Sequence, residues 1–344
     1  MRAKRTAWII CAGLILVIAA FRPAAADNAI SFSLDRPVDG TAAPFLLPLD
    51  RGWYRAAGLD VTVTPADSMM EPILRVASGR SDMGLADINA LIKYRDANPK
   101  APVKAVFMLY NRPAYAVIGR KSRGISAPKD LEGKKLGASP DDPTTAEWPV
   151  FASVNKIDTA KVRIETVSKP VREPMLAAGQ LDAIAGQSFS VYIDLKDKGV
   201  PVDDVVVLQM ADYGVDLYGN AVIVNPKFAA QHPDAVKGFL RAFLKGLKKT
   251  VAAPQAAIGF VLERADGARK NLELERLKMV IRNNILTPEV KAEGYGGIDA
   301  TRFEKAVDQL AIAYKFKSAK PKLQDIFDAS FLPSQDERQL AAEK

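Results

Sequence analysis

The sequence predicts an α/β protein built as two similar lobes, each a mixed, mostly parallel sheet flanked by helices. The first observation that predicts this class is the pattern at residues 52–87, which is typical of a helix end, a strand, a helix and a second strand. Leu59, Val61 and Val63 alternate with polar residues, and Gly79 stands where a helix C-cap needs a left-handed residue. Such a unit makes parallel strands whose carboxyl ends form a ligand-binding edge.

The second observation is that the end of this unit recurs about a hundred residues later. A Gly, two further residues, an Asp and a strand follow a predicted helix at 79–84 and again at 179–184. A Glu-Pro pair lies near the start of each helix, at 71–72 and 173–174. Two lobes built alike are the simplest explanation, and a common helix-to-strand turn that occurs twice by coincidence is the alternative.

The remaining elements follow from the same rules of alternation and punctuation. Thr41 can cap a helix that carries Phe45 and Trp53 on its inner side, and from Pro233 onward the chain is mostly helical, with a basic face that we interpret as solvated. We expect further strands at 29–34, 103–109, 115–119, 135–138, 162–166, 182–186 and 205–209, and helices at 87–96, 145–155, 171–178 and 189–198.

The N-terminus has the pattern of a signal peptide. Three basic residues precede an uncharged apolar run at 8–21, which is too short to span a bilayer comfortably, and Ala24-Ala25-Ala26 forms a cleavage site. A retained anchor is the alternative, and Cys11 belongs to the apolar run because Ile10 does not suit a lipoprotein site. We therefore divide the chain into a signal peptide at 1–26, a first part of lobe 1 at 27–116, lobe 2 at 117–221, and a lobe 1 return segment with C-terminal helices at 222–344. The first crossover lies near Tyr115, and the return crossover is at 221–224.

Composition excludes several classes of protein. The formal net charge of +8 falls to +4 once the four basic residues of 1–26 are removed, and no basic stripe indicates nucleic-acid binding. The remaining chain has no cysteine, which excludes disulfides and thiol catalysis. Its one histidine, His232, directly precedes a proline, so a Ser-His-Asp triad or a histidine metal site is not expected. We expect no metal and no cofactor.

Three runs carry a resemblance to a known family: DRGWYRAAGLDV at 50–61, ASGRSDMGLAD at 77–87 and DLEGKKLG at 130–137. They resemble the solute-binding proteins of ABC importers, in the branch that takes up alkanesulfonates, nitrate, thiamine-pyrimidine precursors and similar small molecules. The resemblance extends from about residue 30 to about residue 332. It implies a type II periplasmic binding fold whose lobes are joined by two crossover strands, a periplasmic location, and ABC permease membrane subunits as partners. We expect a monomer.

Ligand-binding residues are expected directly after strands, where helix N-termini of both lobes present free N–H groups to the cleft. The resemblance supports the positions after the first strand, at 68–70, at 86–87 and at 139–145. Ser68, Asp87 and Thr144 have the alternative role of helix caps, and the aromatic candidates have the alternative role of core residues. The candidates are Asp35, Arg36, Phe45, Ser68, Met69, Met70, Asp87, Asn89 and Asn111 in lobe 1, and Ser139, Asp142, Thr144, Thr145, Trp148, Gln187, Phe189 and Tyr213 in lobe 2.

The charges and aromatic residues among these candidates favour a small aromatic or heterocyclic solute, such as a substituted pyrimidine. Carboxylates near the cleft would repel a free anion, at on the order of 1–4 kcal/mol for two charges a few ångströms apart. Only Arg36 and Arg112 are basic and close to strand ends. An alkanesulfonate, nitrate or an aromatic carboxylate held by Arg36 is the alternative ligand.

We therefore predict a periplasmic receptor that closes on its solute by hinge motion near Tyr115 and at residues 219–220, and that delivers the solute to a permease. Two other functions are the alternatives. One is an enzyme on the same fold, because pyrimidine-synthesising proteins resemble this branch, although the lone histidine and the signal peptide argue against it. The other is a secreted sensor domain that signals to a membrane kinase.

Overall fold

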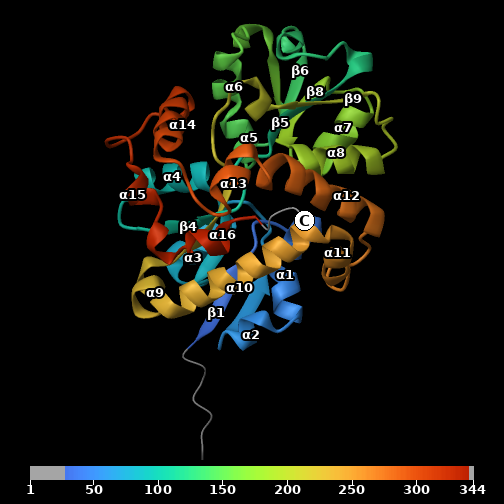
Figure 1. The fold of residues 1–344 in the computed structure, drawn as a ribbon. Helices are drawn as coiled ribbons and strands as arrows, with labels where there is room; N and C mark the ends of the chain where they lie inside the picture. The colour runs from blue at the N-terminus through green and yellow to red at the C-terminus, as the bar shows by residue number, and fades with distance from the viewer. Residues whose placement is uncertain (1–27, 341–344) are drawn as a thin grey trace, which may run out of the picture.

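In the computed structural model, which describes residues 28–340, ten strands form two five-stranded sheets. The first sheet has the order β2-β1-β3-β10-β4, and the second has the order β7-β6-β8-β5-β9. Figure 1 shows the second sheet (green) above the first (blue), which confirms the predicted two-lobe α/β fold. The strands are β1 Ala29–Ser33, β2 Asp60–Thr64, β3 Met83–Asp87, β4 Lys104–Met108, β5 Tyr115–Arg120, β6 Lys135–Ala138, β7 Arg163–Thr166, β8 Ala183–Gln187, β9 Val205–Gln209 and β10 Asn220–Val224.

Helices cover the sheets and make up most of the chain after β10. The predicted signal peptide at 1–26 and Cys11 lie outside the described residues. The helices are α1 Ala43–Asp50, α2 Trp53–Ala56, α3 Glu71–Ser78, α4 Ile88–Ala97, α5 Pro143–Ala146, α6 Trp148–Val154, α7 Lys169–Ala177, α8 Ser188–Asp197, α9 Pro226–Gln231, α10 Pro233–Ala252, α11 Pro254–Leu262, α12 Lys270–Val280, α13 Pro288–Glu293, α14 Ala300–Ala313, α15 Leu323–Ile326 and α16 Gln335–Arg338.

The two sheets have the same internal arrangement. In the first, β1 runs parallel to β2 and β3, while β10 is antiparallel to β3 and β4. In the second, β6 runs parallel to β7 and β8, while β5 is antiparallel to β8 and β9. The repeated sequence pattern marks equivalent places in this arrangement, because Gly79 ends α3 before β3 with φ 75° and Gly179 follows α7 before β8 with φ 72°.

Three expectations differ from the structure by more than one residue at an end or in the role of the segment. The helix predicted at 145–155 is interrupted at Glu147, because Pro149 has no N–H to continue the hydrogen-bond ladder. The helix predicted from residue 171 begins at Lys169, because Pro170 is tolerated in a first helical turn. Residues 221–224, predicted as the return crossover, belong to β10 of the first sheet, and the chain passes between the sheets in the preceding segment. The lobe boundaries placed at 116/117 and 221/222 stay predictions.

The core of the first lobe is aromatic and depends on the long helix α10. The Phe45 ring of α1 lies 4.9 Å from the Phe32 ring and 4.6 Å from the Phe243 ring of α10, between centroids. Helix α10 comes so close to α1 at Gly246 that a Cβ there would lie 2.7 Å from the carbonyl oxygen of Pro44. The core of the first lobe is therefore completed by a helix that follows the second sheet in the chain.

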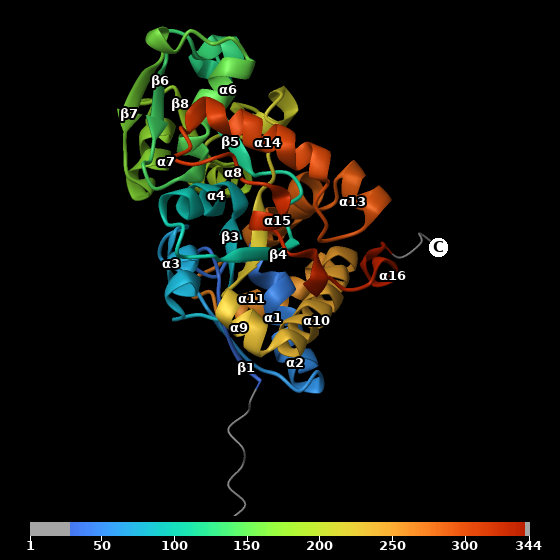
Figure 2. The ribbon, with the colours of Figure 1, turned by 90° about the vertical axis from the view of Figure 1, so that its left-hand side faces the viewer.

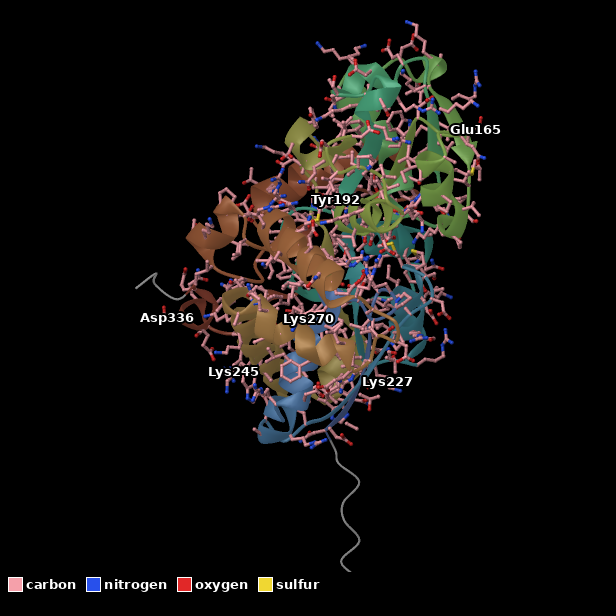
Figure 3. The ribbon with its side chains drawn as sticks, turned by 90° about the vertical axis from the view of Figure 1, so that its right-hand side faces the viewer. Glu165, Tyr192, Lys227, Lys245, Lys270 and Asp336 are labelled. Atoms are coloured by element: carbon pink, nitrogen blue, oxygen red, sulfur yellow. The ribbon has the colours of Figure 1, made fainter. Side chains whose placement is uncertain are left out.

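Helix α10 presents its basic face outward. Arg241, Lys245 and Lys249 are exposed, and Figure 3 shows Lys245 at the outside of the lower lobe. The Lys245 ammonium lies 4.1 Å from the ring centroid of Trp53, a cation–π contact. Within residues 28–340, no helix has both the length and the apolar composition that crossing a membrane requires.

The C-terminal helices brace the passage between the sheets, and Figure 2 shows α13, α14 and α15 along one side of both lobes. Arg302 of α14 donates from Nη2 to the carbonyl oxygens of Asn111 and Leu217, at 2.9 Å each. These residues lie in the two connections, one after β4 and one before β10. Its other N–H groups bond Asn111 Oδ1, Glu289 and Asp216. One side chain thus fixes both connections.

Candidate functional site

A cleft of about 370 Å³ lies where the carboxyl ends of strands from both sheets meet. The volume is within the range of small-molecule sites, and the position is the one expected for α/β folds with parallel strands. The first lobe lines the cleft with residues 35–39 and 67–69. The second lobe contributes Asp142, Lys169, Arg172, Glu173, Gln187, Ser190 and Asp194, and α12 contributes Arg276.

Arg36 crosses the cleft from the first lobe to the second. Its Nη2 lies 2.7 Å from Asp35 Oδ2 and also donates to Gln187 Oε1, and its Nη1 donates to Ser190 Oγ at 3.2 Å. The guanidinium carbon lies 5.0 Å from the ring centroid of Phe189. Because Arg36 follows β1 of the first sheet, while Gln187 ends β8 of the second sheet and Ser190 lies in α8, these contacts connect the two lobes across the cleft.

Arg172 organises the wall on the second lobe. It is buried, and its Nη1 donates to Asp142 Oδ2 at 3.0 Å and to the carbonyl oxygen of Ala185 at 2.7 Å. Its Nη2 lies 2.6 Å from Glu173 Oε1. Asp142 also caps α5 by accepting from the N–H of Thr144 at 3.0 Å. Burial acts to lower the pKa of Arg172, but the charges of Asp142 and Glu173 raise it overall.

A second polar group lies buried beside the connections between the lobes. Asp87 caps α4 by accepting from the N–H groups of Asn89 and Ala90, at 2.9 Å each, and the Tyr115 hydroxyl donates to its other carboxylate oxygen. Asn89 Nδ2 donates to the Tyr218 carbonyl oxygen at 2.7 Å. Burial raises the pKa of Asp87 to about 6, although its hydrogen bonds act in the opposite direction.

An ion pair joins the lobes next to this group. Lys93 Nζ of α4 lies 2.5 Å from Glu147 Oε1, which stands between α5 and α6 of the second lobe. Only 2% of the Glu147 side chain is exposed. Burial raises the pKa of Glu147 to about 7, with Lys93 acting in the opposite direction. The contact between the lobes therefore buries ionisable groups away from the cleft lining.

The structure brings some of the predicted residues together in the cleft and separates others from it. None of these placements tests ligand contact, so the predicted roles stay predictions. Asp35, Arg36, Ser68, Met69, Asp142 and Gln187 line the cleft. Asp87, Asn89, Ser139 and Thr144 are buried without lining it, Met70 and Thr145 are half-buried at helix starts, Asn111 lies in the connection bonded by Arg302, and Tyr213 packs edge-on against Phe151.

The aromatic candidates lie in the cores of the lobes. Phe45 is fully buried among the rings of the first-lobe core and does not line the cleft. Phe189 is also fully buried, with the Arg36 guanidinium over its ring, and Trp148 packs against Phe151 with ring centroids 5.9 Å apart. No aromatic side chain lines the cleft among the described residues.

Sequence reasoning missed the residues that lie within helices instead of directly after strands. Gln187, Ser190 and Asp194 have the spacing of one helix face, which could have revealed the latter two. Lys169 and Arg172 occupy the first turn of α7. A prediction that this helix starts at Lys169 instead of residue 171 would have identified both as candidates. Arg276 gives no sequence signal, because only tertiary packing brings α12 to the cleft. Asp39 and Asp67 were also missed.

The comparisons with known proteins agree with this geometry. A family model described as NMT1/THI5 like matches residues 40–257. The formylaminopyrimidine-binding protein of Halalkalibacterium halodurans is 25% identical over 271 residues, which cover 76% of this chain and 78% of that protein. The riboflavin-binding protein RibY of Chloroflexus aurantiacus is 24% identical over 298 residues, covering 85% and 82%.

Enzymes also occur among the relatives. The 4-amino-5-hydroxymethyl-2-methylpyrimidine phosphate synthase of Schizosaccharomyces pombe is 26% identical over 230 residues, which cover 62% of this chain. This chain thus matches 63% of the length of that synthase, less than two thirds. The relatives alone therefore leave both a binding protein and an enzyme open.

Solved structures show the fold. The alkanesulfonate-binding protein SsuA of Xanthomonas axonopodis pv. citri, bound to MOPS, superposes with a TM-score of 0.66 at 13% identity, covering 88% of this chain and 99% of that one. A Candida albicans protein described as having the generic periplasmic binding protein fold gives 0.64 at 13% identity, covering 92% and 98%. The chain has the fold of periplasmic binding proteins.

Proposed function

The chain belongs to the NMT1/THI5-like family, and we propose that it is the solute receptor of an ABC importer for a small pyrimidine-like heterocycle. The observation that carries this proposal is the cleft itself, which collects strand ends from both lobes and is bridged by Arg36 to Gln187 and Ser190. A solute that contacts both walls would stabilise the closed arrangement and would shift the population of a hinged protein toward it.

The charge of the cleft supports a heterocycle over a free inorganic anion. Six carboxylates and four basic side chains line it. An excess of negative charge disfavours nitrate or a simple sulfonate, whereas the amino groups of a pyrimidine can donate to carboxylate and amide oxygens. A formylaminopyrimidine-binding protein is among the relatives, which supports the same class.

Planar packing in the cleft would come from Arg36 and Met69 instead of aromatic side chains. One face of the Arg36 guanidinium lies on Phe189. Its other face would stack on a flat ring, and the polarizable Met69 side chain also suits an aromatic surface. This arrangement replaces the aromatic stacking that the sequence predicted.

A receptor is favoured over an enzyme by the position of the only histidine. His232 lies at the junction of α9 and α10, with its ring centroid 4.9 Å from that of Phe228, and does not line the cleft. The cleft thus lacks the residue most often used for proton transfer near neutral pH. We place the receptor in the periplasm on the pattern at residues 1–26.

The test is a thermal-shift screen of residues 27–344 against pyrimidines, alkanesulfonates, nitrate and aromatic acids, followed by calorimetry on each hit. A ligand present at a hundred times its dissociation constant should stabilise the protein by about 2.7 kcal/mol. Gln187→Ala should weaken binding, and Gln335→Ala, which changes a glutamine of α16 outside the cleft, should not.

Two results would contradict the proposal. If the parent and Gln187→Ala bound the hit with equal affinity, the cleft would not be the binding site. Conversion of a pyrimidine precursor into product by the purified protein would establish the enzyme alternative.

A further inference from the structure

Most charges of the cleft neutralise one another. Arg36 pairs with Asp35, Arg172 pairs with Asp142 and Glu173, and Arg276 pairs with Glu273 and Asp194 at 3.1 and 3.2 Å. Each of these three guanidinium groups has at least one carboxylate within hydrogen-bond distance. A solute entering the cleft therefore meets three guanidinium groups whose charge is already compensated by carboxylates and whose hydrogen-bonding capacity is partly used.

Lys169 is the exception among the cations of the cleft. It is half-buried as the first residue of α7, and its ammonium makes no hydrogen bond or ion pair with any part of the chain that the structure describes. Burial lowers the pKa of Lys169. The charges of Arg36 and Arg172 also lower it, whereas those of Asp142 and Asp35 raise it. Keeping an ammonium half-buried without a partner is unfavourable unless a ligand supplies one.

Asp67 on the opposite wall differs from Lys169 in its surroundings. Its carboxylate also has no side-chain partner among residues 28–340, but the residue is exposed, so water can solvate its charge. The unsatisfied charge within the cleft is therefore the ammonium of Lys169. The negative excess of the lining disfavours a ligand that is only an anion, yet the single unpaired cation among the described lining residues requires one acidic group as its partner.

We propose that the solute carries one anionic substituent, a carboxylate or a phosphate, and that Lys169 selects it. This inference rests on the proposed receptor function and narrows its ligand class. The heterocycle would pack near Arg36 and Met69, and its acidic group would reach α7 on the second lobe. Because Lys169 belongs to one lobe and Met69 to the other, such a solute contacts both walls and favours closure.

The experiment compares matched compounds that differ only in the acidic group. One pair is 4-amino-5-hydroxymethyl-2-methylpyrimidine and its phosphate, and the other is uracil and its carboxylated form, orotate. Binding of each is measured by calorimetry to the parent, Lys169→Gln, Lys169→Arg and Lys121→Gln. Lys121 is an exposed lysine on the second lobe outside the cleft, and its replacement is the control for loss of one positive charge.

In the parent, the anionic member of one pair should bind roughly tenfold or more tightly than its neutral counterpart, as expected for a charge-assisted hydrogen bond. Lys169→Gln should remove this preference without weakening the neutral compound, Lys169→Arg should retain most of it, and Lys121→Gln should leave it unchanged. Which pair shows the preference distinguishes phosphate from carboxylate.

The failures of the two proposals are distinguishable. If a neutral pyrimidine binds the parent at least as tightly as its anionic partner, the Lys169 inference is overturned and the receptor proposal stands. The same holds if Lys169→Gln keeps the full preference for the anion. If none of the four compounds binds the parent, the pyrimidine-receptor proposal and the inference are both refuted.

Discussion

Replacing Asp87 by Asn should remove a loss of stability that the parent protein suffers as the pH rises. Asp87 is 1% exposed and caps α4, and its carboxylate accepts three hydrogen bonds. Asn is an equally good N-cap, and its amide oxygen can accept from the same backbone N–H groups. The substitution therefore removes the titration of the side chain and keeps its shape.

The size of the effect follows from the pKa of the carboxyl group. Burial raises this pKa from 3.8 to about 6, so the native state holds a proton that the unfolded chain releases over this interval. The stabilisation is fully present below pH 3.8 and is lost as the pH rises through 6. About 2 pKa units at roughly 1.4 kcal/mol each give a loss of about 3 kcal/mol.

Urea unfolding of the parent and Asp87→Asn at pH 4, 5, 6 and 7 measures this loss. The parent should lose about 2 kcal/mol more than the variant between pH 4 and pH 7, because pH 4 already lies just above the pKa of the unfolded state and part of the loss has occurred there. Glu147 titrates in the same window and in the same direction in both proteins. Because the charge of Asp87 contributes to the raised pKa of Glu147, the difference between the two proteins reports Asp87 together with its coupling to Glu147. Asp308→Asn, which removes an exposed carboxylate of α14, is the control and should follow the parent. Parallel curves for the parent and Asp87→Asn would refute the reasoning.

Three further substitutions test the packing and the hinge. Arg302→Lys keeps the charge but cannot reproduce five directed N–H groups, so small-angle scattering should show a larger open fraction than in the parent, and an unchanged profile would contradict its bracing role. Gly246→Ala should destabilise the protein by about 1–3 kcal/mol in urea unfolding, because the new Cβ would lie 2.7 Å from the Pro44 carbonyl oxygen, and a neutral result would show that α10 can move. Phe45→Ala should cost about 3–5 kcal/mol and leave ligand affinity unchanged, whereas lost affinity with intact stability would return Phe45 to the site.

The fold could be predicted from the sequence because the residues that begin and end its helices and strands act through their neighbours in the chain. Gly79 and Gly179 both adopt positive φ, a requirement of the turn that is visible in the residue type alone. The alternation of Leu59, Val61 and Val63 likewise reports burial on one face of a strand, and β2 forms at 60–64. These signals depend on neighbours in the chain, so they can be recognised without knowledge of the tertiary structure.

The site was only partly predictable because burial depends on residues far away in the chain. Phe45 follows the first strand, as a ligand contact would, but it is covered by Phe243, which belongs to a helix some two hundred residues later. Arg276 reaches the cleft from α12 for the same reason. Position after a strand therefore identified the edge of the cleft, whereas packing decided which side chains remained available at that edge.

The charge that a solute meets in the cleft also depends on tertiary packing, because packing decides which charged groups are paired. Asp35 and Asp142 suggested a repulsive cleft when the sequence was considered alone, because their partners could not be assigned. In the structure Arg36 and Arg172 neutralise them, and both arginines are themselves held by further hydrogen bonds. Counting acidic residues thus predicts the sign of the total charge, but selectivity depends on the charge left unpaired. In this cleft the unpaired charge is the ammonium of Lys169, which lies one turn before Arg172 on the same helix. The two basic residues therefore have different roles: Arg172 is held by carboxylates of the cleft wall, and Lys169 is available to the solute.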